Sequence, residues 1–314
     1  MRNNQFPLSA YQSMPQRRGR KKLLSRYGGI VRNIAMLIMV AAIGMLFIQV
    51  RSLQFKIDEL SKAQKLSAGN FTQRSATGRE YQDKNIAQRI TYNNQSFDTY
   101  VVDISNTQVK FFFKDSEGNK FGSLENLKEF VASNSNELIF GTNAGMFTPS
   151  SEPLGLFVEQ GQELFPLNLK DGKDNFFLKP NGVFAITDKR AYVVESPAYP
   201  NLAKSVLISG ATQSGPMLVI GGRIHPKFNK NSANRNIRSG VGIISPTKIV
   251  FAISNDLVNF YDFAMLFKEQ FKCQDALFLD GAISKMYLPV LERNELDGNF
   301  AGMIGITKKA QIRE

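Results

Sequence analysis

The sequence predicts an α+β domain with a mixed, largely antiparallel β-sheet and packed helices, preceded by one transmembrane helix. Three observations support this fold class. From Phe97 onward, short runs rich in β-branched and aromatic residues alternate with turn residues, which is typical of strands. Only two segments in that region have the apolar spacing of a helix. One long uncharged apolar run lies near the N-terminus.

Composition excludes several classes of protein. The chain has 314 residues, 43% of them hydrophobic and 21% charged, which is enough for one large globular domain. The only cysteine, Cys273, excludes an intrachain disulfide, and the only histidine, His225, excludes sites that need two histidines. Residues 1–32 carry eight Lys or Arg and no acidic residue, so most of the net charge of +12 is at the N-terminus. We therefore expect no nucleic-acid partner.

Residues 33–51 predict a transmembrane signal anchor. No charged residue occurs from Asn33 to Val50, and about 18 helical residues at about 1.5 Å each span most of a hydrocarbon core about 30 Å thick. The run is long for a signal peptide and is not followed by a small-x-small cleavage site. The basic tail, residues 1–32, is expected in the cytoplasm. Everything after Arg51 is then extracytoplasmic, either periplasmic or extracellular.

Residues 52–96 predict a juxtamembrane helix followed by a polar linker. Leu53, Ile57 and Leu60 recur at helical spacing, and this short amphipathic helix is a candidate for self-association. The following segment is rich in Ser, Thr, Asn and Gln, as linkers are. The folded domain is expected over residues 97–314.

The elements of that domain follow from local patterns. The first two strands, 100–104 and 109–113, are expected to pair with each other across a Ser-Asn-Thr turn. Ser123 and Asn259 are expected to cap the two helices. The remaining expected strands are 137–142, 156–159, 163–165, 175–179, 182–187, 191–195, 217–220, 241–244, 248–253 and 276–279.

Four segments place polar residues beside glycines at the ends of apolar strands, where the backbone can approach a ligand closely. They are residues 141–147, 209–218, 234–242 and 276–287. Each segment alone is better explained as a capped turn. Together they supply one carboxylate, one guanidinium and two carboxamides, which favours a common site.

The motifs in these segments have a recognisable order. They read Asn143-Ala144-Gly145-Met146-Phe147, then Gln213-Ser214-Gly215-Pro216, then Arg238 before Gly240-Val241-Gly242, then Leu279-Asp280-Gly281 before Ser284. Over roughly residues 97–310 the chain therefore resembles the phosphodiester glycosidase family. The chain departs from the family where Ala144 and Met146 alter the first motif and where Ala282 and Ile283 replace glycines in the last.

The resemblance implies hydrolysis of a sugar C1–O–P linkage. A phosphate monoester is a good leaving group, so an electrostatic clamp on the phosphate and a carboxylate near C1 can carry the reaction. Asp280 is the expected carboxylate, as nucleophile or as base for water, and Arg238 is the expected phosphate clamp. Asn143 is the third expected catalytic residue and donates to phosphate or sugar oxygens. The expected substrate-binding residues are Gln213, Ser214, Gly215, Gly145, Gly281 and Ser284, and Ser284 is also expected to orient Asp280.

The expected function is a membrane-anchored hydrolase that acts on sugar-1-phosphodiesters of envelope or exported glycans, with no cofactor and no metal. Two alternatives stay open: a tethered domain that binds glycan or protein without catalysis, and a nucleophilic site that pairs Cys273 with His225. We expect Cys273 to be a buried small hydrophobic residue and His225 to lie in an exposed turn.

Overall fold

The computed structural model describes residues 36, 39, 85–281 and 283–310. The expected basic tail, the signal anchor except for Met36 and Met39, and the juxtamembrane helix lie outside this part of the chain. No helix within the described residues is long and apolar enough to cross a bilayer.

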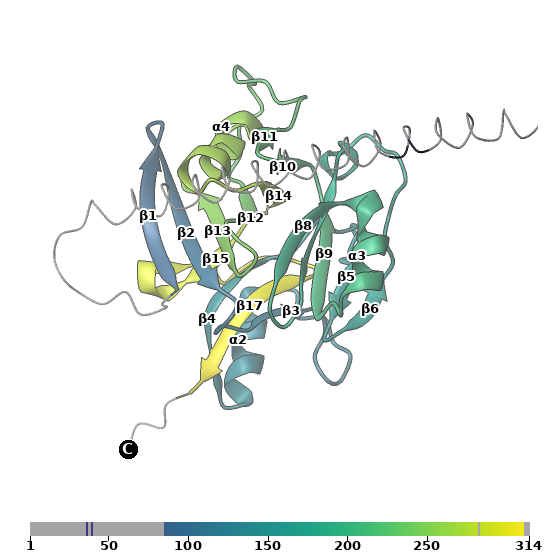
Figure 1. Ribbon diagram of the computed structural model, residues 1–314. Helices are drawn as coiled ribbons and strands as arrows, with labels where there is room; N and C mark the ends of the chain where they lie inside the picture. The colour runs from purple at the N-terminus through teal and green to yellow at the C-terminus, as the bar shows by residue number, and fades with distance from the viewer. Residues whose placement is uncertain (1–35, 37–38, 40–84, 282, 311–314) are drawn as a thin grey trace, which may run out of the picture. The chain divides into compact units, whose positions relative to one another are not determined.

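Three antiparallel sheets build the domain (Figure 1). Every pairing between described strands is antiparallel, which confirms the expectation of largely antiparallel pairing. The expected mixed character is not found among the described strands, because none of them pair in parallel. The seven-stranded sheet has the order β1 (Ile86–Tyr92), β2 (Gln95–Asp103), β13 (Lys248–Ser254), β12 (Ser239–Ile243), β14 (Asp275–Asp280), β10 (Met217–Ile220) and β11 (Arg223–Ile224). One five-stranded sheet has the order β16 (Arg293–Asn294), β15 (Met286–Leu288), β4 (Asn136–Asn143), β17 (Met303–Lys309) and β3 (Val109–Phe112). The other has the order β6 (Gln162–Phe165), β5 (Phe157–Glu159), β9 (Gly210–Ser214), β7 (Gly182–Ile186) and β8 (Ala191–Glu195).

The three sheets share one apolar core. Phe251 of β13 packs against Phe140 of β4, with ring centroids 4.9 Å apart, and against Phe184 of β7 at 5.9 Å. These three fully buried rings come from the three different sheets. Each aromatic pair contributes about 0.5–1.5 kcal/mol beyond the area that it buries. The contacts at Phe251 therefore hold the sheets in a fixed arrangement, which in turn fixes the loops at the strand ends.

Both expected helices are confirmed, with their caps. Helix α2 (Leu124–Ser133) begins after Ser123, whose Oγ accepts from the Asn126 N–H at 3.1 Å. Helix α4 (Phe260–Met265) begins after Asn259, whose Oδ1 accepts from the Asp262 N–H at 2.8 Å. The shorter helical segments are α3 (Tyr199–Ser205), the 3₁₀ turns η1 (Asn175–Phe177), η2 (Ser196–Ala198) and η4 (Pro289–Leu291), and the π-turn η3 (Leu266–Gln270).

Three local expectations are corrected. The sheet begins at Ile86, before Phe97 where the folded domain was expected to start, because β1 forms a hairpin with β2 through Asn93 and Asn94 in the left-handed conformation. Strands β2 and β3 are present but do not pair, since β2 lies between β1 and β13 while β3 pairs with β17. Residues 175–179 are not a strand, and their first three form η1.

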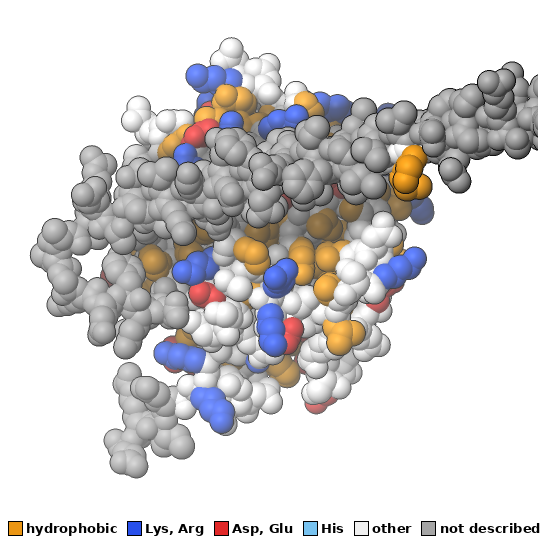
Figure 2. All heavy atoms as spheres, in the orientation of Figure 1, with side chains coloured by type: hydrophobic (Ala, Val, Ile, Leu, Met, Phe, Trp, Pro, Cys, Tyr) orange, Lys and Arg blue, Asp and Glu red, His pale blue; other side chains and the backbone are white. Residues whose placement is uncertain are grey.

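A buried ionic network ties the first hairpin to β16. Asp98 is completely buried, and its carboxylate accepts from Arg89 at 2.7 Å and from Arg293 at 2.9 Å. Burial opposes ionisation of Asp98, but hydrogen bonds from Arg89, Arg293 and Asn255 outweigh it and lower its pKa. Elsewhere Lys and Arg side chains are scattered among apolar and uncharged ones on the described part of the face in Figure 2.

Candidate active site

A cavity of about 320 Å³ lies where three of the four glycine-containing segments meet. Arg238 and Asp280, the two charged residues expected to act on substrate, both line it, and so does Gly281. Amides and one further carboxylate line it beside apolar side chains. The other lining residues are Met146, Phe147, Leu154, Asp174, Asn175, Phe176, Asn234 and Asn236. The sequence therefore correctly predicted that the segments containing Met146, Arg238 and Asp280 converge.

Arg238 is held rigidly at the start of β12. Its side chain is almost fully buried; Nε donates to the Val258 carbonyl at 2.9 Å, and Nη2 donates to the carbonyl and Oδ1 of Asn234 at 3.0 and 3.1 Å. The guanidinium carbon lies 3.7 Å from the centre of the Phe260 ring, a cation–π contact. Nη1 makes no hydrogen bond to a described residue. The guanidinium is thus fixed by its protein contacts and keeps one amino group for a ligand.

The positive charge of Arg238 has no counter-charge in the described part of the chain, where no carboxylate lies within ion-pair distance of it. Burial lowers the pKa of Arg238 from 12.5 to about 10, so the side chain stays protonated at neutral pH. A buried charge without a partner is costly. An anionic ligand in the cavity would supply the missing charge.

Asp280 ends strand β14 on the wall of the same cavity. Burial raises its pKa from 3.8 to about 6, although the Gly281 N–H donates to its Oδ1 at 2.5 Å and favours the charged form. Asp280 forms no ion pair with Arg238, so the two groups are free to face different parts of one ligand. A carboxylate with this pKa is ionised at pH 7 yet basic enough to accept a proton.

A buried hydrogen-bond network stands behind Asp280. Ser284 Oγ lies 2.5 Å from the Asp280 carbonyl and 3.0 Å from Ser239 Oγ, and Ser239 Oγ lies 3.2 Å from Asn143 Oδ1. Asn143 Oδ1 also accepts from the Lys285 N–H at 3.2 Å. The network clamps the backbone of the Asp280 loop to the end of β4. Ser284 therefore orients Asp280 through its main chain, and it does not line the cavity of Arg238 and Asp280.

The expected role of Asn143 is revised in the same way. It is buried, it does not line the cavity, and its Nδ2 donates to the Ala144 carbonyl at 3.1 Å. The structure therefore places Asn143 behind the wall of the cavity, where it acts as a positioning residue for the Asp280 loop.

The expectation that Gln213 binds substrate is the one that the structure corrects most clearly. Its carboxamide is buried, with Oε1 accepting from the N–H groups of Leu156 and Asn168 at 3.1 and 2.8 Å. Its Nε2 donates to the Asn168 carbonyl at 2.7 Å and to Ser196 Oγ at 3.0 Å. All four hydrogen-bonding positions of the amide are occupied, so Gln213 cannot donate to substrate.

The rest of the second segment also supports the wall of the cavity from behind. Ser214 Oγ donates to the Leu279 carbonyl at 2.7 Å, and a Cβ on Gly215 would lie 2.7 Å from the Phe176 carbonyl oxygen. Gly145 packs so closely on the Gln213 backbone that no side chain fits there. These residues position the neighbours of Asp280 and Phe176, and none of them lines the cavity. Of the expected substrate-binding residues only Gly281 does.

The sequence did not single out the second carboxylate of the cavity. Asp174 precedes η1 and the expected strand 175–179, and the only signal for it is a polar run around Asp171 and Asp174. Asn234 and Asn236 belong to the third glycine-containing segment, but the sequence predicts no role in substrate binding for them. Asn236 Nδ2 donates to Asn234 Oδ1 at 2.7 Å. Within the described residues, no group of three or more His, Cys, Asp or Glu side chains is placed to hold a metal ion.

The alternative nucleophile and base are both buried away from the reaction. Cys273 is in the core and burial raises its pKa to about 12, which confirms it as a small hydrophobic residue. His225 is 1% exposed, so the expectation of an exposed turn is wrong. Its ring stacks on Phe228, which stacks on Phe260 beneath Arg238. His225 thus supports the guanidinium through two aromatic rings.

Comparison with known proteins identifies the class to which this fold and site belong. A family model described as phosphodiester glycosidase matches residues 136–307, more than half of the chain, and the chain belongs to this family. The resemblance stated from the motifs is thereby confirmed. The "uncharacterized protein YigE" of Escherichia coli K12 is 37% identical over 189 residues, which cover 60% of this chain and 73% of that protein.

Solved structures with similarity to the chain include the catalytic domain of zebrafish N-acetylglucosamine-1-phosphodiester alpha-N-acetylglucosaminidase, auto-inhibited by its pro-peptide. That match has a TM-score of 0.48 at 13% identity and covers 74% of this chain and 85% of the other. A hypothetical protein from Synechocystis matches with a TM-score of 0.42 at 13% identity, over 70% and 61% of the two chains. A putative exported protein from Burkholderia pseudomallei K96243 matches with a TM-score of 0.44 at 10% identity, over 68% and 74%.

Proposed function

We propose that the protein hydrolyses sugar-1-phosphodiesters, with the cavity around Arg238 and Asp280 as its active site. Membership of the phosphodiester glycosidase family supports the reaction class. The observation that carries the assignment is that a buried guanidinium without a counter-charge and a carboxylate of raised pKa line one cavity without pairing with each other. In a sugar phosphodiester, the phosphate anion can bind the Arg238 guanidinium while the anomeric carbon lies near the Asp280 carboxylate.

In the proposed reaction water adds to C1 of the sugar. The C1–O bond breaks, its electron pair stays with the oxygen of the departing phosphate monoester, and Asp280 takes a proton from the attacking water. Arg238 binds the phosphate through Nη1 and stabilises the charge that develops on the leaving group. The products are a free sugar and a phosphate monoester, and no redox step or cofactor is needed.

The apolar part of the cavity suits the sugar ring, since Met146, Phe147 and Phe176 line it beside the amides of Asn175 and Asn236. Small-molecule sites commonly combine such apolar walls with a few polar groups that fix the orientation of the ligand. The cavity of about 320 Å³ is at the lower end of the range for ligand sites. It therefore holds one sugar with its phosphate, and any further part of a longer substrate lies outside it.

We also propose that the enzyme is anchored in a membrane by residues 33–51 and that the hydrolase domain is extracytoplasmic. The uncharged apolar run and the eight basic residues before it support this topology. The substrates would then be phosphodiesters of envelope or exported glycans. A reporter fused to the C-terminus tests the topology: activity restricted to the extracytoplasmic side agrees with it, and a reporter active only in the cytoplasm contradicts it.

The function is tested with full-length protein and the methyl phosphodiester of N-acetylglucosamine-1-phosphate. Asp280→Asn and Arg238→Ala should both abolish release of the free sugar, while Asp188→Asn, a change at an exposed turn, should leave it unchanged. Unchanged turnover in both site variants would remove the assignment. Binding of the diester without any product in the wild-type protein would favour the non-catalytic glycan-binding alternative.

A further inference from the structure

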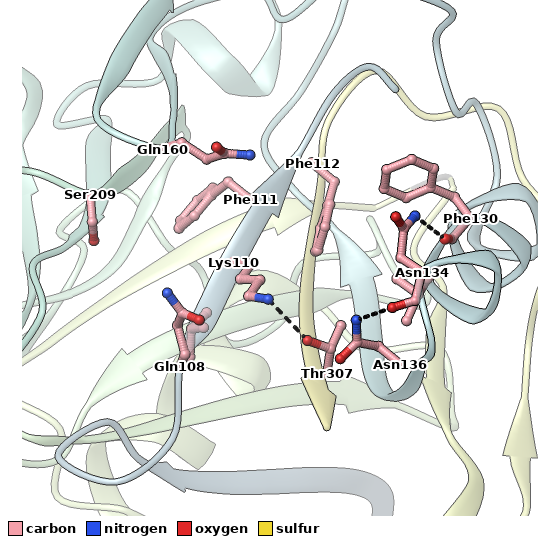
Figure 3. A pocket seen from close by; sticks show the side chains of 12 residues that line it. Gln108, Lys110, Phe111, Phe112, Phe130, Asn134, Asn136, Gln160, Ser209 and Thr307 are labelled. Carbon is pink, nitrogen blue, oxygen red and sulfur yellow. Dashed lines mark hydrogen bonds between the residues drawn. The ribbon is translucent and has the colours of Figure 1, made fainter. Parts of the chain in front are cut away.

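A second cavity, of about 650 Å³, lies around the edge strand β3, away from Asp280 (Figure 3). Its walls come from β3, from helix α2 with the start of β4, from β17, and from the residues at the β5–β6 turn and before β9. It is lined by Gln108, Val109, Lys110, Phe111, Phe112, Phe130, Val131, Asn134, Asn136, Gln160, Ser209 and Thr307. None of these residues lines the cavity of Arg238 and Asp280.

The two cavities are separate but close, and no residue lines both. Lys110 of β3 pairs opposite Gly305 of β17, which pairs opposite Gly141 of β4, so Lys110 lies two strands, or about 10 Å, across the sheet from β4. Strand β4 ends two residues later at Asn143, which is joined through Ser239 to the Asp280 loop. A ligand of the second cavity is therefore either a separate molecule or another part of a polymer bound at the first.

The polar groups of the second cavity suit hydroxyls and an anion. The carboxamides of Gln108 and Gln160 make no hydrogen bond to a described residue, and so are available as donors and acceptors. No Asp or Glu lines the cavity. Lys110 donates to Thr307 Oγ1 at 3.2 Å, and among the described residues it has no carboxylate partner, so its charge is available to a ligand.

The apolar groups complete a site for a sugar. Figure 3 shows Phe112 and Phe130 on one side of β3, while Gln160 and Ser209 lie on its other side. Asn134 and Asn136 hold each other in place beside Phe130, because Asn136 Nδ2 donates to the Asn134 carbonyl at 2.7 Å and Asn134 Nδ2 donates to the Phe130 carbonyl at 2.8 Å. Aromatic faces with a few fixed amides are a usual lining for a small polar-apolar ligand.

We propose that this second cavity binds a phosphorylated segment of the glycan whose phosphodiester linkage is cleaved in the first cavity at Asp280, with Lys110 binding the phosphate. The inference rests on the proposed function, because the polymer bound here is the glycan substrate proposed above. The site would hold long substrates on the enzyme between successive cleavages. Charge complementarity favours a phosphorylated glycan over a neutral one, since Lys110 is the only charged residue of the lining.

The test compares a long and a short substrate. Lys110→Gln should raise KM for a linear polymer of N-acetylglucosamine-1-phosphate about tenfold, the usual cost of one lost charge-assisted hydrogen bond. It should leave both kinetic constants for the methyl diester unchanged, because the short substrate does not reach β3. Gln108→Ala should act in the same direction more weakly. Lys204→Gln, at an exposed site on α3, is the matched control for loss of one charge and should change neither substrate.

A binding titration separates the failure of this inference from the failure of the proposed function. Asp280→Asn protein is titrated with the phosphorylated polymer and with an unphosphorylated chain of the same sugar, each with and without Lys110→Gln. Binding of the phosphorylated polymer that weakens about tenfold in the double variant supports the site even if no substrate is hydrolysed. Equal binding by both proteins, equal affinity for both polymers, or cleavage kinetics that Lys110→Gln leaves unchanged would each overturn it. So would a Lys110-dependent affinity for an extended peptide alone, which would mark β3 as an edge for strand addition.

Discussion

Replacing Asp280 with Asn should stabilise the folded protein while it removes activity. Burial raises the pKa of Asp280 from 3.8 to about 6, so ionisation of this carboxylate is more costly in the folded than in the unfolded state. Its contribution to stability is fully present below about pH 4 and is lost as the pH rises through about 6. Asn has the same shape, keeps an acceptor for the Gly281 N–H and never ionises.

The size of the effect follows from the two pKa values. A difference of about two units at about 1.4 kcal/mol each makes Asp280→Asn more stable by up to about 3 kcal/mol at pH 7.5. The same linkage leaves an advantage of about 1 kcal/mol at pH 4.5. A stability cost that grows with pH is expected of a carboxylate kept for chemistry.

Urea unfolding of the full-length protein at pH 7.5 and 4.5 measures both values, with Asp188→Asn as the control for removing one negative charge from an exposed position. The control should show no comparable gain. Destabilisation by Asp280→Asn at pH 7.5 would refute the reasoning, because it would mean that the folded protein stabilises the carboxylate.

The other predictions concern rate and stability. kcat/KM for a sugar-1-phosphodiester should fall about tenfold per pH unit below about 6, because Asp280 acts as a base; a rate that rises toward acid in a pH series from 4.5 to 8 would contradict this. Arg238→Met should lower kcat/KM about 10²–10³-fold in steady-state assays, and a loss of less than tenfold would argue against phosphate binding by Arg238. Gln213→Ala should cost about 3 kcal/mol in urea unfolding, because the buried N–H groups of Leu156 and Asn168 lose their acceptor; a cost below about 1 kcal/mol would contradict the role of Gln213. Asp98→Asn should cost about 3–5 kcal/mol in the same assay, and a neutral result would show that the ionic network adds nothing.

Local signals predicted two of the three described α-helices and eleven of the seventeen described strands; they missed α3, β1, β9, β11, β15, β16 and β17. The caps Ser123 and Asn259 marked both helices correctly, because a cap depends only on residues within one helical turn. The pairing of the strands was harder to predict, since β2 and β3 are neighbours in sequence but belong to different sheets. Strand β1 was missed because it is an edge strand that leaves Gln88 and Arg89 exposed, and its composition is that of a linker.

Arg238 and Asp280 of the candidate site could be predicted from sequence, and the roles of the amides could not. Arg238 and Asp280 follow from the motifs at strand ends beside glycines, whose order resembles that of the family. Asn143 and Gln213 carry the same groups whether they bind a ligand or satisfy the backbone, and only the direction of each side chain decides between the two. Asp174 could not be predicted because it precedes a segment, residues 175–179, that was expected to be a strand and not a turn at the cavity.

The central claim, that this cavity breaks the C1–O bond of a sugar phosphodiester, is tested most directly by hydrolysis in ¹⁸O-labelled water with ³¹P NMR of the phosphate monoester. The claim predicts a product without an ¹⁸O isotope shift, formed by wild-type protein and not by Asp280→Asn. Label in the phosphate would show attack at phosphorus, and the assignment of Asp280 to the anomeric carbon would then be wrong.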